Sequence, residues 1–422
     1  MTPPPHPLHV ALFNRAFYPE ISATGQLLTE LAEGLAQNYG CRVTVVAGIP
    51  QGTLEGPWAP SRKWGLVCME QHGSIAVWRA RGTRFQKRNL AGRICNYLTY
   101  FGSACIVGLQ LPRPDVIIAL TDPPIIGLAA LLSGRRFGVP VLISYRDLFP
   151  EVARLISGFR NPLIEGILRQ VNKILIRFSD GIIALSEDMK NRLVKEKKAP
   201  PDKVFIIPDW ADTDVLAPGD KINPFSEKFG LADKFVIMHA GNLGASQGLE
   251  PLLEAAVGFS DTPDLVFVFV GEGIQKEPLK AKASRLGLSN VHFIPYQPKN
   301  TLRDTFAAAD CFVVSLKPGI SGYIVPSKIY SILAAGRPYV AMVDPDSDIA
   351  RLTEKHGCGL LVKQSDPKDL AEKIRRLYMD RALCKKLGQA AFETSAIFAK
   401  EKGVAAYHRL CRAFASGTTG EI

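Results

Sequence analysis

Short apolar stretches alternate with amphipathic stretches along nearly the whole chain. The first series begins with the apolar run HVALFN at His9, continues with a helical pattern in QLLTELAEGLAQNY, and returns to an apolar run in CRVTVVAG. It goes on through DVIIAL, PVLISY and DGIIAL, after which Ser186 is placed to cap a helix. Apolar runs of about four to eight residues between helical patterns are typical of parallel strands. This half of the chain therefore predicts a Rossmann-like sheet covered by helices.

A stretch without periodicity, DWADTDVLAPGDKINPF, separates this series from a second one. There the apolar runs KFVIMHAG, LVFVFVGEG, VHFIP, CFVVSL and YVAMV alternate with helical patterns. Two series of this kind predict an α/β protein of two Rossmann-like domains, over residues 1–205 and 206–395. We expect residues 396–422 to form a helix that returns to the N-terminal domain.

Composition agrees with two globular domains. The 422 residues are 47% hydrophobic and 22% charged, which excludes a disordered chain. The eight cysteines form no C-x-x-C pair and no cluster with histidine, so we expect reduced, buried thiols and no zinc site. The start MTPPPHPLHVALF has no secretory signal pattern, which favours a cytoplasmic protein.

A formal net charge of +11 indicates an anionic partner. In LIEGILRQVNKILIRF, the basic residues Arg169, Lys173 and Arg177 recur every four positions among apolar ones. This pattern suits a helix on an anionic membrane surface, or equally a domain helix with a solvated basic edge. The uncharged stretch 94–112 carries too many polar residues for a membrane span, so we expect a buried or membrane-touching helix. A nucleic-acid-binding protein is not expected, because no recognition motif accompanies the basic residues.

Glycine-rich loops after the strands are the first candidates for chemistry. The loop after the first strand, NRAFYPEISATGQ, lacks the G-x-G-x-x-G pattern, which disfavours a nicotinamide enzyme. Gly25, just before a helix, could contact a ligand or serve only as a turn. In the second half, Gly241–Gly248 joins a strand to a helix and could cradle an anion or act as a flexible turn. The triplet Gly271-Glu272-Gly273 repeats this arrangement after the next strand.

The segment SGYIVPSKIYSILAAGRP, from Ser321, predicts an anion site at a helix start. We expect Pro326 as its first helical residue and Gly336 as its C-terminal cap, so that Ser327 and Lys328 fall in the opening turn. Free amides and an ammonium group would then meet, as a diphosphate requires; the alternative is an ordinary surface lysine. The DPDSD stretch at 344–348 has D-x-D spacing but precedes a helix, so we expect it to cap that helix and not to bind a metal.

The ordered set of these stretches resembles the retaining glycosyltransferases of the GT-B fold, family 4, and within them bacterial enzymes of the colanic acid and fucosamine type. The matching stretches include HAGNLGASQGLEPLLEAA, FVFVGEG, VHFIPYQP and VPSKIYSILAAGRPYVA in the second half, and SYRDLFPE, SDGIIALSEDMKNRL and VFIIPDWADTDVLAP in the first. The resemblance covers nearly the whole chain. It implies two Rossmann-like domains that face each other across a cleft.

The resemblance also implies a set of site residues, and it shows departures from the family pattern. A donor diphosphate would lie near Gly241–Gln247 and Lys328, the base near Tyr296 and Gln297, and the donor sugar opposite Gly25 and Asp147. The family usually has an arginine and a lysine at Asn242 and Gln247, glutamates at Tyr323 and Ser331, and a histidine at Arg146. The expected donor-binding residues are Gly25, Gly241, Asn242, Gly244, Gln247, Glu272, Tyr296, Gln297, Tyr323, Ser327, Lys328 and Ser331.

We therefore expect the chain to move a sugar from a nucleoside diphosphate donor to a lipid-linked or other saccharide acceptor, with retention of configuration and without a metal or cofactor. Asp147 is the candidate catalytic residue. The acceptor or membrane side is expected to hold Arg146, Arg169, Lys173 and Arg177, at the inner face of the cell membrane. The alternatives are a sugar-nucleotide epimerase and a non-catalytic binding protein that resembles a glycosyltransferase.

Overall fold

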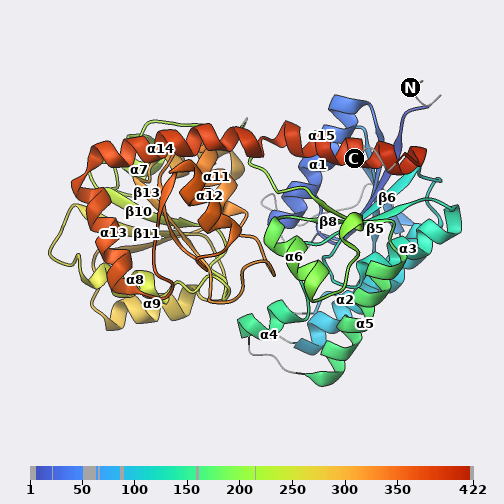
Figure 1. Ribbon diagram of the computed structural model, residues 1–422, viewed down its shortest axis with the longest axis horizontal. Coiled ribbons are helices and arrows are strands. Elements are labelled where there is room, and N and C mark those ends of the chain that lie inside the picture. Colours follow the sequence, from blue (N-terminus) through green and yellow to red (C-terminus); the bar gives the residue numbers. More distant parts are fainter. Residues whose placement is uncertain are drawn as a thin grey trace. The chain divides into compact units, whose positions relative to one another are not determined.

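The computed structural model describes residues 6–20, 22–50, 63–64, 67–85, 90–157, 161–213 and 215–418. The chain divides into two compact units (Figure 1). The first consists of Met1–Pro150, Arg160–Pro208 and Glu401–Ile422, and the second of Glu151–Phe159 and Asp209–Lys400. Each unit is a Rossmann-like α/β sheet with its own buried core.

The first unit is built on a nine-stranded sheet in the order β3-β4-β5-β2-β1-β6-β7-β8-β9. All neighbours from β2 to β9 in this order pair in parallel, as the sequence predicts. The sequence pattern did not reveal the remaining three strands: β5 pairs in parallel with β2, and β4 and β3 add an antiparallel edge. Its strands are β1 (His9–Phe13), β2 (Arg42–Gly48), β3 (Lys63–Trp64), β4 (Val67–His72), β5 (Ile75–Ala80), β6 (Val116–Leu120), β7 (Val141–Ser144), β8 (Gly181–Ala184) and β9 (Val204–Ile206).

Long helices pack against this sheet, and two glycines allow three of them to lie in close contact. At Gly108 a Cβ would come within 2.3 Å of Ser133 Oγ, and at Gly127 within 2.7 Å of Leu175 Cδ2. Helices α2, α3 and α5 therefore lie side by side (Figure 1). The helices of this unit are α1 (Ala23–Tyr39), α2 (Leu90–Leu109), α3 (Ile126–Phe137), α5 (Pro162–Phe178), α6 (Glu187–Lys195) and α15 (Lys400–Ser416).

The last helix, α15, completes the first unit. Val404 faces Gly34 of α1, where an added Cβ would lie 2.8 Å from its Cγ2. The Tyr407 hydroxyl lies 3.0 Å from Ser144 Oγ at the end of β7, and the His408 ring stacks on Tyr39. Through these contacts the C-terminal helix packs on the core of the first unit, although the contacting residues lie more than 250 positions apart in sequence. Ser144 and Tyr407, for example, are 263 positions apart.

The second unit holds a six-stranded, fully parallel sheet in the order β12-β11-β10-β13-β14-β15. Val236 and Met238 of β10 point into one buried apolar cluster, while Phe235 and Ile237 point into another. Because successive strand residues face opposite sides, the sheet is buried by helices on both faces. The strands are β10 (Phe235–Ala240), β11 (Leu265–Val270), β12 (Val291–Ile294), β13 (Cys311–Ser315), β14 (Tyr339–Met342) and β15 (Gly359–Leu361).

Helices follow each strand of this unit, as the alternating pattern predicts. They are α7 (Pro224–Lys228), α8 (Glu250–Val257), α9 (Lys276–Arg285), α10 (Leu302–Ala307), α11 (Lys328–Ala334), α12 (Asp348–His356), α13 (Pro367–Met379) and α14 (Arg381–Ser395), and the short helix α4 (Glu151–Ser157) is grouped with this unit. The stretch expected to be a linker ends in the first turn of α7, which is capped by Asn223.

Two sequence expectations concern the chain as a whole. Within the described ranges, no helix is both long and apolar enough to cross a membrane. All eight cysteines are free thiols, but Cys95 on α2 is exposed, so the expectation that every cysteine is buried was wrong. The reason is that the apolar residues of α2 occupy its outward side as well as its inward side.

Candidate functional site

Two glycine loops of the second unit are joined backbone to backbone at the carboxyl edge of the sheet. The Gly241 amide donates to the Val270 carbonyl and the Leu243 amide to the Glu272 carbonyl, both at 2.9 Å. At Gly271, where φ is +141°, a Cβ would lie 2.0 Å from the Gly241 carbonyl oxygen. The loops after β10 and β11 can therefore meet only because this position has no side chain.

Lys328 lies at the centre of this edge with its ammonium group turned inward. Its Nζ donates to Gln247 Oε1 at 2.7 Å and lies 2.9 Å from Nε2 of the buried His239. An added Cβ at Gly241 would lie 4.0 Å from the same Nζ, so the glycine loop passes directly over it. Among the described residues, no carboxylate forms an ion pair with Lys328. The sequence expectation that Lys328 and the glycine loop converge agrees with this geometry, whereas a freely solvated surface lysine does not.

Burial shifts the titration of both basic groups. It lowers the pKa of Lys328 to about 7, and it lowers the pKa of His239 well below its usual value, with the nearby lysine acting in the same direction. Both shifts have the same largest cause, since a low-dielectric site without a counter-ion disfavours the charged form. A bound anion would supply the missing counter-ion.

The local chain explains why Lys328 is held in place. Helix α11 starts at Lys328, so the expectation that Pro326 is its first residue was wrong by two positions; the turn before it is of the tighter type, with Ile329 bonded to the Pro326 carbonyl. At the other end, Gly336 has a φ of 62° and its amide and that of Arg337 bond back to Leu333 and Ile332. This closing motif ends the helix as the sequence predicts.

The remaining expected donor residues lie at or near the same edge, with different surroundings. The Asn242 amide group lies between the loops, 2.8 Å from where Cβ atoms would stand at Gly244 and at Gly273. Glu272 is exposed and pairs with Lys276 at 2.5 Å. In the loop after β12, Tyr296 is exposed and the Gln297 amide donates to the Pro295 carbonyl at 2.8 Å.

Three further positions concern helix α11 and the stretch before it. Tyr323, where the family usually has a glutamate, is buried, and its amide bonds to Ile320. Ser327 precedes the helix without capping it through its side chain. Ser331 lies one turn after Lys328 and is partly buried.

Side chains of the D-x-D stretch accept hydrogen bonds from backbone amides. The two carboxylate oxygens of Asp344 accept from the Gly319 and Ser321 amides at 3.0 and 3.3 Å, and Ser347 caps α12 by accepting from Ala350. Over the described ranges, no group of three metal-ligating side chains comes together.

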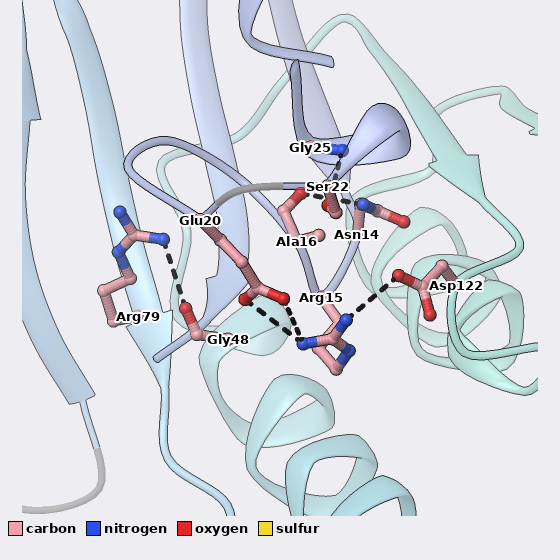
Figure 2. A network of polar contacts seen from close by, with 9 residues as sticks. All are labelled: Asn14, Arg15, Ala16, Glu20, Ser22, Gly25, Gly48, Arg79 and Asp122. Carbon is pink, nitrogen blue, oxygen red and sulfur yellow. Dashed lines mark hydrogen bonds and ion pairs between the residues drawn. The ribbon is translucent and has the colours of Figure 1, made fainter. Parts of the chain in front are cut away.

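The carboxyl edge of the first unit carries a network of buried charges (Figure 2). Arg15, two residues after β1, donates to both carboxylate oxygens of Glu20 at 2.9 and 3.2 Å and to Asp122 Oδ2 at 3.4 Å. Glu20 is buried, whereas Asp122 is partly exposed. The Arg15 amide also bonds to the Asp122 carbonyl, so side chain and backbone fix Asp122 in one position.

A second arginine extends this network. Arg79 is 1% exposed; it bonds to Glu70 through Nε at 2.7 Å and to the Gly48 carbonyl at 3.1 Å, and also to the Tyr18 carbonyl. Gly25 lies nearby in the first turn of α1, with its amide bonded to the Ser22 hydroxyl at 3.1 Å (Figure 2). The sequence placed Gly25 before the helix; it is inside, because Ser22 is the cap.

The other acceptor-side residues follow the neighbouring strand and a helix. Arg146 and Asp147 lie two and three residues after the end of β7, and the Arg146 amide donates to the Thr121 hydroxyl at 2.9 Å. Because β6 and β7 are neighbours, Asp122 and Asp147 share one edge. On α5, Arg169 pairs with Glu165 at 3.1 Å, and Lys173 and Arg177 are exposed.

Sequence reasoning missed Arg15, Glu20, Asp122 and His239. The signal for Arg15 and Asp122 was a charged residue within two positions of the end of a buried strand, where ligands of parallel sheets bind. His239 gave no such signal, since a histidine inside an apolar strand is indistinguishable by pattern from any core residue.

Family models match both units in chain order. The glycosyl transferase 4-like domain matches residues 23–210, and the glycosyl transferases group 1 domain matches residues 222–394. The chain is a GT-B glycosyltransferase.

Individual relatives agree with this assignment. The transferase is 26% identical over 397 residues to an Escherichia coli K12 protein assigned to colanic acid biosynthesis as glycosyl transferase WcaI, covering 87% of this chain and 92% of that one. Among solved structures, sucrose-phosphate synthase from Thermosynechococcus elongatus superposes with a TM-score of 0.76 at 17% identity, over 97% and 100% of the two chains. Anabaena HepE in complex with UDP-glucose superposes with a TM-score of 0.72 at 15% identity, over 96% of this chain and 100% of the HepE chain. At these identities the two structures show the shared fold.

Proposed function

We propose that the transferase binds a nucleoside diphosphate sugar with its diphosphate on Lys328 and passes the sugar to a saccharide acceptor. The observation that carries the proposal is a buried ammonium group without a carboxylate partner, overlaid by a glycine loop. Two of its three hydrogens are directed at His239 and Gln247, which leaves one for an incoming phosphate oxygen. HepE, which has the same fold, was solved with UDP-glucose.

The proposed reaction retains the configuration of the sugar and needs no protein nucleophile. The bond between the anomeric carbon and the diphosphate oxygen breaks, a bond from the acceptor hydroxyl oxygen forms on the same face, and the hydroxyl proton passes to the leaving phosphate. Charge grows on the leaving diphosphate during this step, and Lys328 with the glycine-loop amides stabilises it. The chemistry requires no metal or cofactor, so activity should persist in the presence of a chelator.

For the acceptor we propose a polyprenyl-linked saccharide at the cytoplasmic face of the membrane, in the synthesis of a surface polysaccharide. WcaI, the relative described above, is assigned to colanic acid biosynthesis. Asp147 is the candidate for orienting the acceptor hydroxyl, and Asp122, fixed by Arg15 at the same edge, is a second carboxylate available for that role. Arg146 would bind acceptor phosphate, because a guanidinium group stays protonated.

Incubation with radiolabelled nucleotide sugars, with and without a membrane lipid extract, tests this proposal. Label that moves into the lipid fraction only when both donor and extract are present supports it. Conversion of the donor to an isomeric nucleotide sugar without extract would indicate an epimerase instead. Donor binding with neither conversion nor transfer, across a panel of uridine, guanosine and thymidine donors, would indicate a non-catalytic binding protein.

A further inference from the structure

The outward faces of α2, α3 and α5 carry an unusual number of large apolar side chains. Their exposed apolar residues are Leu98, Ile106 and Leu109 on α2, Leu132 on α3, and Leu163, Ile167, Ile174 and Phe178 on α5. Leu163 is 72% exposed and Leu98 is 55% exposed, so these side chains do not belong to the core. Contiguous apolar surface of this kind marks an interaction site.

The same three helices are strongly basic. Their sequences contain six basic residues against a single acidic one, Glu165. The basic residues are all exposed, namely Arg93, Arg135, Arg136, Arg169, Lys173 and Arg177. An apolar surface edged by cations and almost free of carboxylates is complementary to an anionic amphiphile.

Contacts between the helices make this a continuous surface and not three separate ones. Gly108 of α2 sits against Ser133 of α3, and the Arg135 guanidinium of α3 lies over the Phe178 ring of α5 at 5.0 Å. The three helices form one layer on the sheet of the first unit, seen side by side in Figure 1. We call the exposed apolar and basic residues of these helices, as named above, the basic apolar face.

We infer that the basic apolar face docks on a membrane that contains anionic phospholipid, with the leucine and isoleucine side chains inserted between headgroups and the basic side chains on lipid phosphates. Long basic side chains bury their stems along apolar surface while their charges reach the phosphate layer. The inference deepens the proposed function, which supplies a lipid-linked acceptor, by naming the surface that meets the lipid. A second copy of the chain is a weaker occupant, because two such faces would bring together their six basic residues each.

Binding to lipid vesicles, without donor, tests the inference. We expect the transferase to sediment with vesicles of equal parts phosphatidylglycerol and phosphatidylcholine, and not to bind vesicles of phosphatidylcholine alone. It should dissociate from the anionic vesicles as the salt concentration is raised. The triple variant Arg169→Gln/Lys173→Gln/Arg177→Gln should lower the partition coefficient by about a hundredfold, at about fivefold for each near-surface cation. The apolar variant Leu98→Ser/Leu163→Ser/Ile167→Ser is altered only at exposed positions. Its partition coefficient should also fall, by at least about tenfold.

A matched control lies on the second unit, where Ile222→Ser/Met379→Ser/Lys385→Gln/Lys386→Gln removes exposed apolar and basic groups of the same kinds. Its vesicle binding should equal that of the unaltered protein. The inference is overturned by an absence of binding to anionic vesicles, by equal losses in the control, or by full binding of the apolar variant. It is also overturned if light scattering shows a dimer that the apolar variant converts to a monomer, since a second copy then covers the face. Donor titration without vesicles reports separately on the proposed function.

Discussion

Nζ of Lys328 lies 2.9 Å from Nε2 of His239, so two groups that are both cationic when protonated share one buried site. They cannot both carry a proton at low cost, because like charges at this distance repel strongly in a site of low dielectric. Histidine is the group that stays neutral, as its lowered pKa indicates, and it can accept from the ammonium group. The arrangement keeps Lys328 directed at the glycine loop while leaving its charge without compensation.

Replacement of Lys328 by alanine should weaken donor binding by tenfold to a hundredfold. A charge-assisted contact to a phosphate contributes about 1.5 to 3 kcal/mol, and about 1.4 kcal/mol corresponds to a factor of ten. Turnover should fall as well if the contact strengthens while the leaving diphosphate gains charge. Titration calorimetry and single-turnover rates measure the two effects, with the exposed Lys355→Ala as control. Normal donor affinity in a folded Lys328→Ala protein would exclude Lys328 from the site.

Donor binding should take up a proton above neutral pH. Free Lys328 has a pKa near 7, and a bound diphosphate favours its charged form, so the pKa rises in the complex. Both phosphates of a nucleotide sugar are esterified and do not titrate there. Affinity should therefore fall by up to about tenfold per pH unit above about pH 7. Calorimetry at about pH 8 in buffers of different ionisation enthalpy measures the number of protons taken up on donor binding. Identical binding heats in all buffers would contradict the prediction.

The same lysine should give the donor-free protein an uncommon pH dependence of stability. Its pKa is about 7 in the folded state against an ordinary value of 10.5 for a lysine in water, so the unfolded chain binds more protons between these values. The free energy of unfolding should then rise with pH from about 7 to about 10.5 through this group. In the Lys328→Met variant, the free energy of unfolding measured with urea should change less with pH across this range. An unchanged slope would mean that Lys328 is solvated in the free protein.

Two neighbouring glycines should respond very differently to alanine. At Gly271 the new Cβ would meet a backbone oxygen at 2.0 Å with φ at +141°, whereas at Gly244 it would meet only the terminal nitrogen of the Asn242 side chain, at 2.8 Å. We expect Gly271→Ala to lower the free energy of unfolding by on the order of 3 kcal/mol or more, and Gly244→Ala by less than about 1 kcal/mol. Chemical denaturation of both variants measures this. Equal losses would show that the loops do not meet as described.

Buried Arg79 should be essential to the stability of the first unit. Arg79→Met leaves the Glu70 carboxylate and the Gly48 and Tyr18 carbonyls without their donor, which costs about 3 to 5 kcal/mol. The neighbouring Arg81→Met, which removes a partly exposed guanidinium, should cost less than about 1 kcal/mol. Unfolding of the two variants by urea, followed by circular dichroism, gives the comparison. A loss for Arg79→Met as small as that for Arg81→Met would contradict the described network.

The sequence predicted the two parallel sheets because buried strands leave a strong local signal: the β10 run KFVIMHAG is apolar throughout. It did not predict β3 and β4, since β3 has only two residues and the second half of β4, Glu70-Gln71-His72, is polar, so neither strand forms an apolar run. At the site, Lys328 was predictable because a proline and a glycine mark the ends of its helix. The contacts of Lys328 with His239 and Gln247 were not, because they join residues more than 80 positions apart, and only the tertiary fold brings them together.

The position of α15 also affects the order in which the two units can fold during synthesis on the ribosome. Residues 401–416 finish a unit whose first strand begins at His9, so the entire second unit is synthesised before the first can close. The second unit needs only residues already made and can bury its sheet earlier. Until Val404 and Tyr407 emerge, Gly34 and Ser144 remain uncovered in the nascent chain. The surface of the first unit that α15 covers is therefore the last part of that unit to be buried.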